Sequence, residues 1–280
     1  MIARIPIAHI HGGEITEGAF DEAFRHSITK MSHLHFTSTQ EYQNRVIQLG
    51  EQPERVFNVG AIGIDNIIKL DLLSKEAFEE SINFTLGKKN LLVTFHPVTL
   101  ESATAKEQFA SLLTALEQLG ETHVIFTKAN ADTDGRIINE MIDQFVTTYP
   151  LTAVAFTSLG QLRYLSAMQY IDGVVGNSSS GLLEAPSFKI GTINIGDRQR
   201  GRIKADSVMD CKPTVDAITV ALGNLFSAEF YESIKQVENP YGKGGASEKI
   251  VELLKTYPLD GMLKKRFHDQ LCVESYSGKK

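Results

Sequence analysis

Five short apolar runs, each followed by a segment of helical pattern, lie between residues 90 and 195. Such runs are typical of buried strands in a parallel sheet, and their alternation with helices predicts a doubly wound α/β domain. The expected strands are Asn90–Phe95, Thr122–Thr127, Leu151–Phe156, Tyr170–Val175 and Gly191–Ile195. The expected helices are Thr104–Leu119 (opened by a capping box), Asp134–Tyr149, Ser158–Met168, Ser179–Phe188, Pro213–Phe226 and Ser247–Tyr257.

A shorter series of the same kind precedes this domain. Its expected elements are the strands Ile5–Ile10, Leu34–Thr37 and Arg55–Val59 and the helices Asp21–Met31 and Glu41–Leu49. The glycines of Gly60–Gly63 predict a flexible joint, followed by helices at Asp65–Leu73 and Lys75–Ile82. A parallel α/β domain usually needs about 150 residues. We therefore expect the first domain to be incomplete and the chain to be an N-terminally shortened form of a two-domain protein.

The charge balance and the cysteine count argue against several classes of function. The net charge is -6 with no block of basic residues, which argues against a nucleic-acid partner. The sequence contains no run of about 18 apolar residues, so we expect no membrane span, and its first residues lack a secretory pattern. Cys211 and Cys272 have no metal-ligand spacing, so we expect free thiols in a cytoplasmic protein without a bound metal.

The serine loop, Gly176-Asn177-Ser178-Ser179-Ser180-Gly181, joins the fourth of these strands to a helix. Backbone N–H groups and the dipole at a helix start attract anions, and small side chains let a phosphate come close. Serine hydroxyls can donate hydrogen bonds as well. The alternative is an ordinary turn in which one serine caps the helix. Neither a G-x-G-x-x-G nor a Walker sequence is present, which disfavours NAD as a cofactor.

Other polar loops follow the strands of the same domain. His96 follows the first strand, Asn130 lies in the loop after the second, and Phe156 ends the third. Arg198 belongs to the arginine loop, residues 196–202, after the fifth strand. Ligands of parallel α/β sheets bind beyond the carboxyl ends of the strands, so these loops together predict a nucleoside diphosphate site. Taken singly, His96 could be structural, Phe156 a core residue and the arginine loop a solvated turn.

The stretch between residues 9 and 26 has a different chemical character. It concentrates titratable side chains: His9, His11, Glu14, Asp21, Glu22, Arg25 and His26. Carboxylates beside an imidazole are what proton abstraction and proton return require. We therefore treat Asp21, His11 and Glu14 as candidate catalytic residues. Alternatively, Asp21 and Arg25 form a surface pair four residues apart, and the histidines are buried polar residues.

Four motifs in this order resemble those of the hydrolysing UDP-N-acetylglucosamine 2-epimerases of sialic and legionaminic acid biosynthesis. They are His9–Glu22 with Arg25, His26, Thr29 and Lys30; Phe95–Thr99; Asn177–Gly181 with Glu184; and Gly196–Arg202. The resemblance implies an α/β fold of glycosyltransferase-B type, with two Rossmann-like domains and the active site in the cleft between them. We expect domains at residues 1–63 and 64–245, then a segment 246–280 whose helix returns to the first domain. Its residues 263–267 are expected to form a basic helical tail.

The resemblance also implies a reaction and a set of roles. UDP is eliminated across C1–C2 of the sugar, and water adds to the glycal to release N-acetylmannosamine or a related 2-epimer. The diphosphate would be held by His96, Ser178, Ser179, Ser180 and Arg198, and the ribose side by Asn130 and Glu184. Many relatives have glutamate where this chain has His11, so the acid and base stay open among His11, Glu14 and Asp21. No metal or cofactor is implied, and we expect a homo-oligomer, either a dimer or a tetramer.

Three alternatives stay open on the sequence. The same loops would serve a UDP-2,4-diacetamido-2,4,6-trideoxyglucose substrate of legionaminic acid synthesis. A glycosyltransferase of the same architecture would use the serine loop similarly but would not need the titratable cluster at residues 9–26. A shortened chain could also be an inactive fragment that binds UDP.

Overall fold

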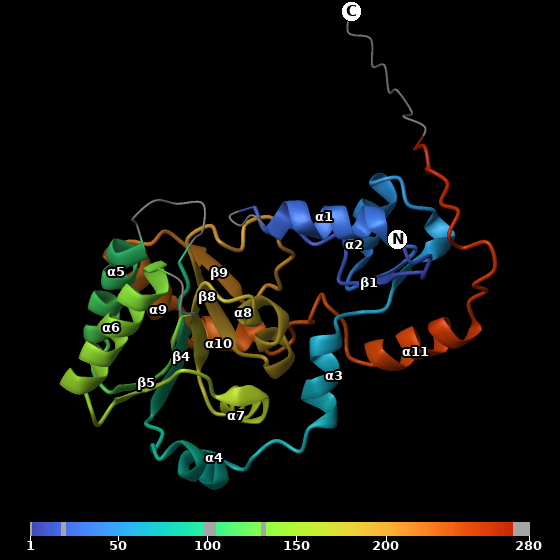
Figure 1. Ribbon diagram of the computed structural model, residues 1–280. Coiled ribbons are helices and arrows are strands. Elements are labelled where there is room, and N and C mark those ends of the chain that lie inside the picture. The colour runs from blue at the N-terminus through green and yellow to red at the C-terminus, as the bar shows by residue number, and fades with distance from the viewer. Residues whose placement is uncertain (1, 18–20, 98–104, 130–132, 271–280) are drawn as a thin grey trace, which may run out of the picture. The chain divides into compact units, whose positions relative to one another are not determined.

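The computed structural model describes residues 2–17, 21–97, 105–129 and 133–270. The chain divides into two compact units (Figure 1). The first combines Met1–Glu14, Ala23–Ile62 and Gly245–Lys280, and the second combines Ile15–Glu22 and Gly63–Gly244. Within the described ranges, no helix has both the length and the apolar character needed to cross a bilayer.

The first unit contains a parallel sheet of three strands in the order β1-β2-β3. The strands are β1 Ala8–Ile10, β2 Leu34–Thr37 and β3 Val56–Asn58. The helices are α1 Asp21–Met31 (in this unit from Ala23 onward), α2 Gln40–Gln48 and α11 Ala246–Thr256, with a 3-10 turn, η1, at Pro53–Arg55. The predicted element types and their order are confirmed here. The strand β1 begins later than expected, and Pro6 has no N–H to contribute to a ladder.

The core of the first unit forms between β2 and α11. Leu34 and Phe36 of β2 are buried in one cluster with Ala246 and Ile250 of α11, and Met262 completes it. Fully burying a side chain of the size of leucine or phenylalanine contributes roughly 1.5–3 kcal/mol. The helix α11, from the far end of the chain, is therefore an integral part of this unit.

A buried carboxylate, Glu51, ties the last described segment to the first unit. Its side chain is 1% exposed and contacts Lys30 Nζ at 2.6 Å, His35 Nε2 at 2.9 Å and Lys265 Nζ at 2.7 Å. Lys265 also donates to the carbonyl oxygens of Lys30 and Ser32. Residues 263–267 are not helical. The prediction of a helical tail is therefore wrong, because contacts of Lys265 hold this segment in a non-helical conformation.

The contacts around Glu51 decide its charge. Burial alone would raise the pKa of Glu51, but hydrogen bonds from His35, Lys265 and Lys30 outweigh it and lower the pKa to about 2. Burial lowers the pKa of both His35 and Lys265, and Glu51 offsets only part of each change. His35 is therefore mostly neutral near pH 7 and donates through Nε2 to an ionised Glu51.

The second unit contains a parallel sheet of six strands in the order β6-β5-β4-β7-β8-β9. The strands are β4 Lys89–Thr94, β5 Thr122–Thr127, β6 Ala153–Phe156, β7 Gly173–Gly176, β8 Gly191–Ile195 and β9 Val208–Cys211. The first five confirm the predicted strands, but the expected total of five is wrong because β9 adds an edge strand. Asp210 interrupts the apolar run of β9, and none of the four side chains of this strand is fully buried. This strand therefore lacks the pattern of a central strand.

Helices cover both faces of this sheet, which gives the three layers of the predicted doubly wound domain (Figure 1). One face carries α5 Ala105–Glu117, α6 Thr133–Thr148 and α9 Val215–Leu225. The other carries α4 Lys75–Ile82 and α7 Gly160–Ala167, and Ile67 of α3 Ile62–Lys69 packs against the same cluster. Apolar side chains at helical spacing account for both layers: Phe109 and Leu112 of α5 are fully buried on the first face, and Phe78 of α4 on the second.

Two elements near or in the second unit differ from prediction, and one predicted residue lies outside the described ranges. The joint expected at Gly60–Gly63 is partly helical, because α3 begins at Ile62 and ends at Lys69. A helix that was not predicted, α10 Ala228–Ile234, follows α9 and is capped by Ser227. The proposed capping residue Thr104 lies outside the described residues.

Candidate functional site

The serine loop leaves the end of β7 in a conformation that requires glycine. Gly176 has a φ of 136°, and a Cβ at this position would lie 1.9 Å from the carbonyl oxygen of Thr94 on β4. Any side chain here would force the two neighbouring strands apart. The close approach places the loop against the end of β4, where His96 follows.

Asn177 fastens the serine loop to two other loops. Its side chain is 1% exposed, accepts a hydrogen bond from the His96 N–H at 2.7 Å and donates one to the His96 carbonyl oxygen at 2.7 Å. The carbonyl oxygen of Asn177 accepts from Arg198 Nη1 at 3.0 Å and from Gln199 Nε2 at 2.8 Å. One residue thus connects the loops after β4, β7 and β8, which sequence analysis assigned to the same edge of the sheet.

Only one turn of α-helix follows the serine loop, which corrects the prediction of a helix over Ser179–Phe188. The helix α8 covers Ser180–Leu183, and a 3-10 turn, η2, covers Ala185–Phe188, because Pro186 cannot continue the helical hydrogen bonds. A single turn supplies little macrodipole. Ser179 at the N-cap makes no capping hydrogen bond with its side chain in the described part of the chain. The loop therefore offers an anion its N–H groups and hydroxyls rather than the dipole of a long helix.

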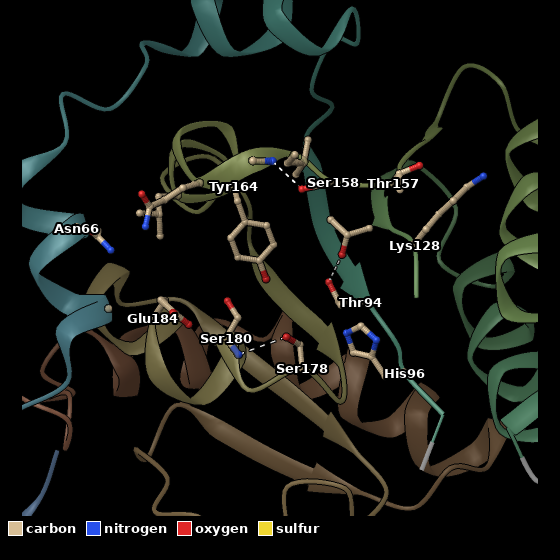
Figure 2. A pocket seen from close by; sticks show the side chains of 16 residues that line it. Asn66, Thr94, His96, Lys128, Thr157, Ser158, Tyr164, Ser178, Ser180 and Glu184 are labelled. Carbon is tan, nitrogen blue, oxygen red and sulfur yellow. Dashed lines mark hydrogen bonds between the residues drawn. The ribbon is translucent and has the colours of Figure 1, made fainter. Parts of the chain in front are cut away.

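A pocket of about 360 Å³ opens beside the serine loop (Figure 2). Four of the predicted binding residues line it: His96, Ser178, Ser180 and Glu184. The N–H of Ser180 donates to the Ser178 hydroxyl at 3.3 Å, and the hydroxyls of Thr94 and Thr127 share a hydrogen bond beside them. The lining is therefore rich in neutral donors and contains one carboxylate, Glu184, and one ammonium group, Lys128. Such a lining suits a ligand that offers both acceptor oxygens and hydroxyl groups, as a nucleotide does.

The pocket also includes residues that sequence analysis missed. Tyr164 of α7 directs its hydroxyl into the pocket near Ser180, and Asn66 of α3 lines it as well (Figure 2). Tyr164 occupies an ordinary position of an amphipathic helix, so its chemistry is not visible in the pattern. The one available signal is its place on a short helix that begins at the carboxyl edge of the sheet, where ligands bind.

The other predicted binding residues are not part of this lining. Ser179 and Arg198 do not line the pocket among the described residues, although both belong to loops that Asn177 connects. Asn130 lies outside the described residues. Phe156 packs against an apolar cluster of the second unit, which favours the core interpretation over stacking on a base.

The arginine loop after β8 holds the segment that leads into α1. Arg200 Nε lies 3.1 Å from Glu17 Oε2, and Arg202 Nη2 donates to Thr16 Oγ1 at 3.3 Å. The Glu17 N–H also donates to the Arg200 carbonyl oxygen at 3.4 Å. Asp21, the first residue of α1, is exposed. The arginines thus hold Thr16 and Glu17, which precede one of the three candidate catalytic residues in the sequence.

The other two candidate catalytic residues meet in the first unit. His11 Nδ1 lies 2.7 Å from Glu14 Oε1, and Ser38 Oγ donates to the same oxygen at 3.3 Å. Glu14 is 5% exposed. His11 has a φ of 62°, a left-handed conformation that costs a residue other than glycine of the order of 1 kcal/mol. An imidazole paired with a buried carboxylate can take up and return a proton.

Gly13 lets this loop lie against α2. It has a φ of 80°, and a Cβ there would lie 2.3 Å from the carbonyl oxygen of Tyr42. Arg45 Nη1 donates to the Gly13 carbonyl oxygen at 2.6 Å. The backbone at Gly13 therefore lies directly against α2, and Arg45 of the same helix binds its carbonyl oxygen.

His9 has a structural contact. Its Nδ1 lies 3.2 Å from Thr29 Oγ1. Burial, followed by the electrostatic effect of the neighbouring His35 and Arg25, lowers the pKa of His9 to about 4. His9 is therefore neutral near pH 7, which supports the interpretation of this histidine as a partly buried polar residue.

Comparison with known proteins adds to this geometry. The family described as UDP-N-acetylglucosamine 2-epimerase matches residues 1–255. A Campylobacter jejuni protein named GDP/UDP-N,N'-diacetylbacillosamine 2-epimerase (hydrolyzing) is 40% identical over 270 residues, which are 96% of this chain and 70% of that protein. The polysialic acid biosynthesis protein P7 of Escherichia coli is 42% identical over 255 residues, which are 91% of this chain and 64% of that protein.

A solved structure supports the fold. The crystal structure of UDP-GlcNAc 2-epimerase from Neisseria meningitidis bound to UDP-GlcNAc gives a TM-score of 0.75 at 20% identity. The match covers 91% of this chain and 71% of that one. It confirms the predicted fold class, an α/β architecture of glycosyltransferase-B type.

Proposed function

The chain belongs to the UDP-N-acetylglucosamine 2-epimerase family, and on that premise we propose that it is a hydrolysing 2-epimerase of a UDP-linked 2-acetamido sugar. The proposed reaction eliminates UDP across C1–C2 and then adds water to the glycal, which releases the free 2-epimer. With UDP-N-acetylglucosamine the product is N-acetylmannosamine, a starting point for nonulosonic acid synthesis.

The pocket beside the serine loop is the observation that carries this proposal. Negative charge develops on the departing diphosphate, and donors already in place stabilise it without reorganisation. Ser178, Ser180 and His96 supply such donors in the pocket. Arg198 is held at the carbonyl oxygen of Asn177, one residue before Ser178, and would add positive charge. Glu184 accepts hydrogen bonds and suits the ribose hydroxyls.

The proton transfers need groups of another kind. A base must remove the C2 proton during elimination, and an acid must return a proton to C2 during hydration. We assign one step to the hydrogen-bonded pair of His11 and Glu14, which shares its proton as a unit. Asp21 takes the other step. Which step belongs to which group is decided by kinetics of single variants.

Incubation with UDP-N-acetylglucosamine in D₂O tests the reaction. The proposal expects equimolar UDP and N-acetylmannosamine that carries one deuterium at C2, because solvent adds across the C1–C2 double bond. NMR measures both the product and its label. A glycosyltransferase that leaks hydrolysis would give unlabelled N-acetylglucosamine. UDP binding in calorimetry without sugar release would instead identify an inactive nucleotide-binding chain.

The second candidate substrate is a UDP-linked 2,4-diacetamido-trideoxy sugar. It is favoured by the Campylobacter relative, whose name specifies N,N'-diacetylbacillosamine. A competition experiment with both UDP-sugars at equal concentration gives the ratio of their kcat/KM values directly. A preference of tenfold or more for the diacetamido sugar would replace N-acetylglucosamine as the proposed substrate.

Binding and turnover are expected to separate in single variants. Ser178→Ala and Arg198→Ala should each weaken UDP binding about tenfold or more, because a hydrogen bond to a charged group contributes about 1.5–3 kcal/mol. Asp21→Asn should leave UDP binding within about twofold and mainly lower kcat, because it keeps the shape of the side chain but removes a titratable group. Calorimetry and steady-state kinetics measure the two effects. Equal losses of UDP affinity in all three variants would contradict this division.

A further inference from the structure

Tyr164 has a buried hydroxyl that the fold does not use. Its oxygen makes no hydrogen bond with any residue that the structure describes, and the Ser180 hydroxyl in the same pocket is in the same condition. Buried polar groups are nearly always hydrogen-bonded, and leaving one without a partner destabilises the folded state. Two such hydroxyls that point into one pocket indicate a partner outside the chain (Figure 2).

Other tyrosines of the second unit show the contrast. The hydroxyl of Tyr170 donates to the carbonyl oxygen of Leu73 at 2.7 Å, and that of Tyr241 donates to the carbonyl oxygen of Ile203 at 2.9 Å. These phenols connect segments of the backbone that are distant in sequence. Tyr164 makes no such connection within the described ranges, so a purely structural role does not account for its hydroxyl.

The surroundings of the Tyr164 hydroxyl define the chemistry of its partner. Burial raises the pKa of Tyr164 to about 12; the neighbouring Ser180 hydroxyl offsets part of that rise, and the negative charge of Glu184 adds to it. The phenol therefore stays protonated and can donate at any physiological pH. Ser178 and Thr94 also present hydroxyls to this space. Several hydroxyl groups that face one pocket fit an oxygen-rich anion.

We propose that Tyr164 donates a hydrogen bond to a phosphate oxygen of the bound nucleotide, with Ser180 as a second donor to the same group. This inference rests on the proposed function, since it requires a nucleoside diphosphate in the pocket beside the serine loop. Glu184 lines the same pocket but is an acceptor, so it suits the ribose rather than the phosphate. Tyr164 is thus a binding residue supplied by α7, outside the serine loop.

The test compares wild type with Tyr164→Phe, Ser180→Ala and the control Tyr231→Phe. Tyr231 is an exposed tyrosine of α10, so its variant controls for the chemical change alone. Calorimetry measures affinity for UDP and for uridine, and a thermal scan without ligand measures the midpoint of unfolding. Tyr164→Phe should weaken UDP binding about tenfold, as expected for losing one charge-assisted hydrogen bond. It should leave uridine binding within about twofold.

Stability provides the independent readout. Tyr164→Phe should leave the unfolding midpoint of the ligand-free protein unchanged or raise it, because it removes a buried hydroxyl without a protein partner. A lower midpoint would show a structural role and overturn the inference, as would unchanged UDP affinity. An equal loss for uridine and UDP would also overturn it, because the hydroxyl would then bind the nucleoside. Wild type that binds UDP but releases no sugar contradicts the proposed function and leaves the Tyr164 comparison valid.

Discussion

Glu51→Gln is expected to lower the free energy of unfolding by about 3 kcal/mol at pH 7, the largest effect on stability among the changes considered. The pKa of Glu51 falls from an ordinary 4.5 to about 2 on folding, which corresponds to about 3 kcal/mol. Removing the charge also leaves Lys30 and Lys265 near one another without their shared carboxylate. Urea denaturation followed by circular dichroism measures the difference.

The pH dependence of this effect has a definite sign. Because the folded pKa of Glu51 is depressed, its stabilisation is complete above about pH 5 and is lost as the pH falls toward 2. The difference between wild type and Glu51→Gln should therefore shrink over that range. A constant difference from pH 7 to pH 3 would contradict the assignment.

A matched control and a local readout sharpen the test of Glu51. Glu41 pairs with Arg45 one turn along α2 but is 59% exposed, so Glu41→Gln should change stability by less than about 0.5 kcal/mol. Limited proteolysis should also cut between residues 258 and 270 faster in Glu51→Gln, because Lys265 loses its ionic partner. Equal rates of cleavage in Glu51→Gln and Glu41→Gln would show that other contacts hold this segment.

Glu14→Gln is expected to lower kcat by a factor of about 100 to 10,000, the range that a positioned acid or base contributes. The variant keeps an oxygen that can accept from Ser38 Oγ but cannot carry the proton shared with His11. UDP affinity should stay within about twofold, because the proposed UDP contacts belong to the second unit. Steady-state kinetics and UDP calorimetry check the two expectations.

The control for Glu14→Gln is Glu252→Gln, an exposed position on α11 of the same unit. It should leave kcat unchanged. His11→Asn should lose activity to a degree similar to Glu14→Gln, and the double variant should lose little more, because the two residues act as one proton carrier. If the fold-loss of kcat in the double variant equals the product of the two single fold-losses, His11 and Glu14 act independently.

Much of the fold could be predicted because burial leaves a direct mark on sequence. The strands Leu34–Thr37, Thr122–Thr127 and Gly191–Ile195 match the structure at both ends, since each combines apolar and β-branched or aromatic residues. Edge strand β9 escaped prediction because an edge position does not demand continuous apolar residues. The contact between Glu51 and Lys265 joins residues more than 200 positions apart, and no local pattern encodes it.

The sequence predicted which loops form the candidate site but not the directions in which side chains from the helices point. Glycine and serine at the end of an expected strand indicated where the pocket lies. The hydroxyl of Tyr164 could not be placed, because its direction depends on how α7 packs against the sheet. The helix expected after Ser179 failed at Pro186, where the effect of one missing N–H outweighed the apolar pattern.

The connections made by Asn177 have a consequence for how substrate preference can change during evolution. One buried residue holds three loops in a fixed arrangement, so under the proposed function phosphate binding would not have to be rebuilt when other parts of the substrate change. Residues that contact the sugar can then vary while the nucleotide is still bound in the same way. A shared nucleotide anchor would let one scaffold diversify toward differently acylated sugars through few substitutions.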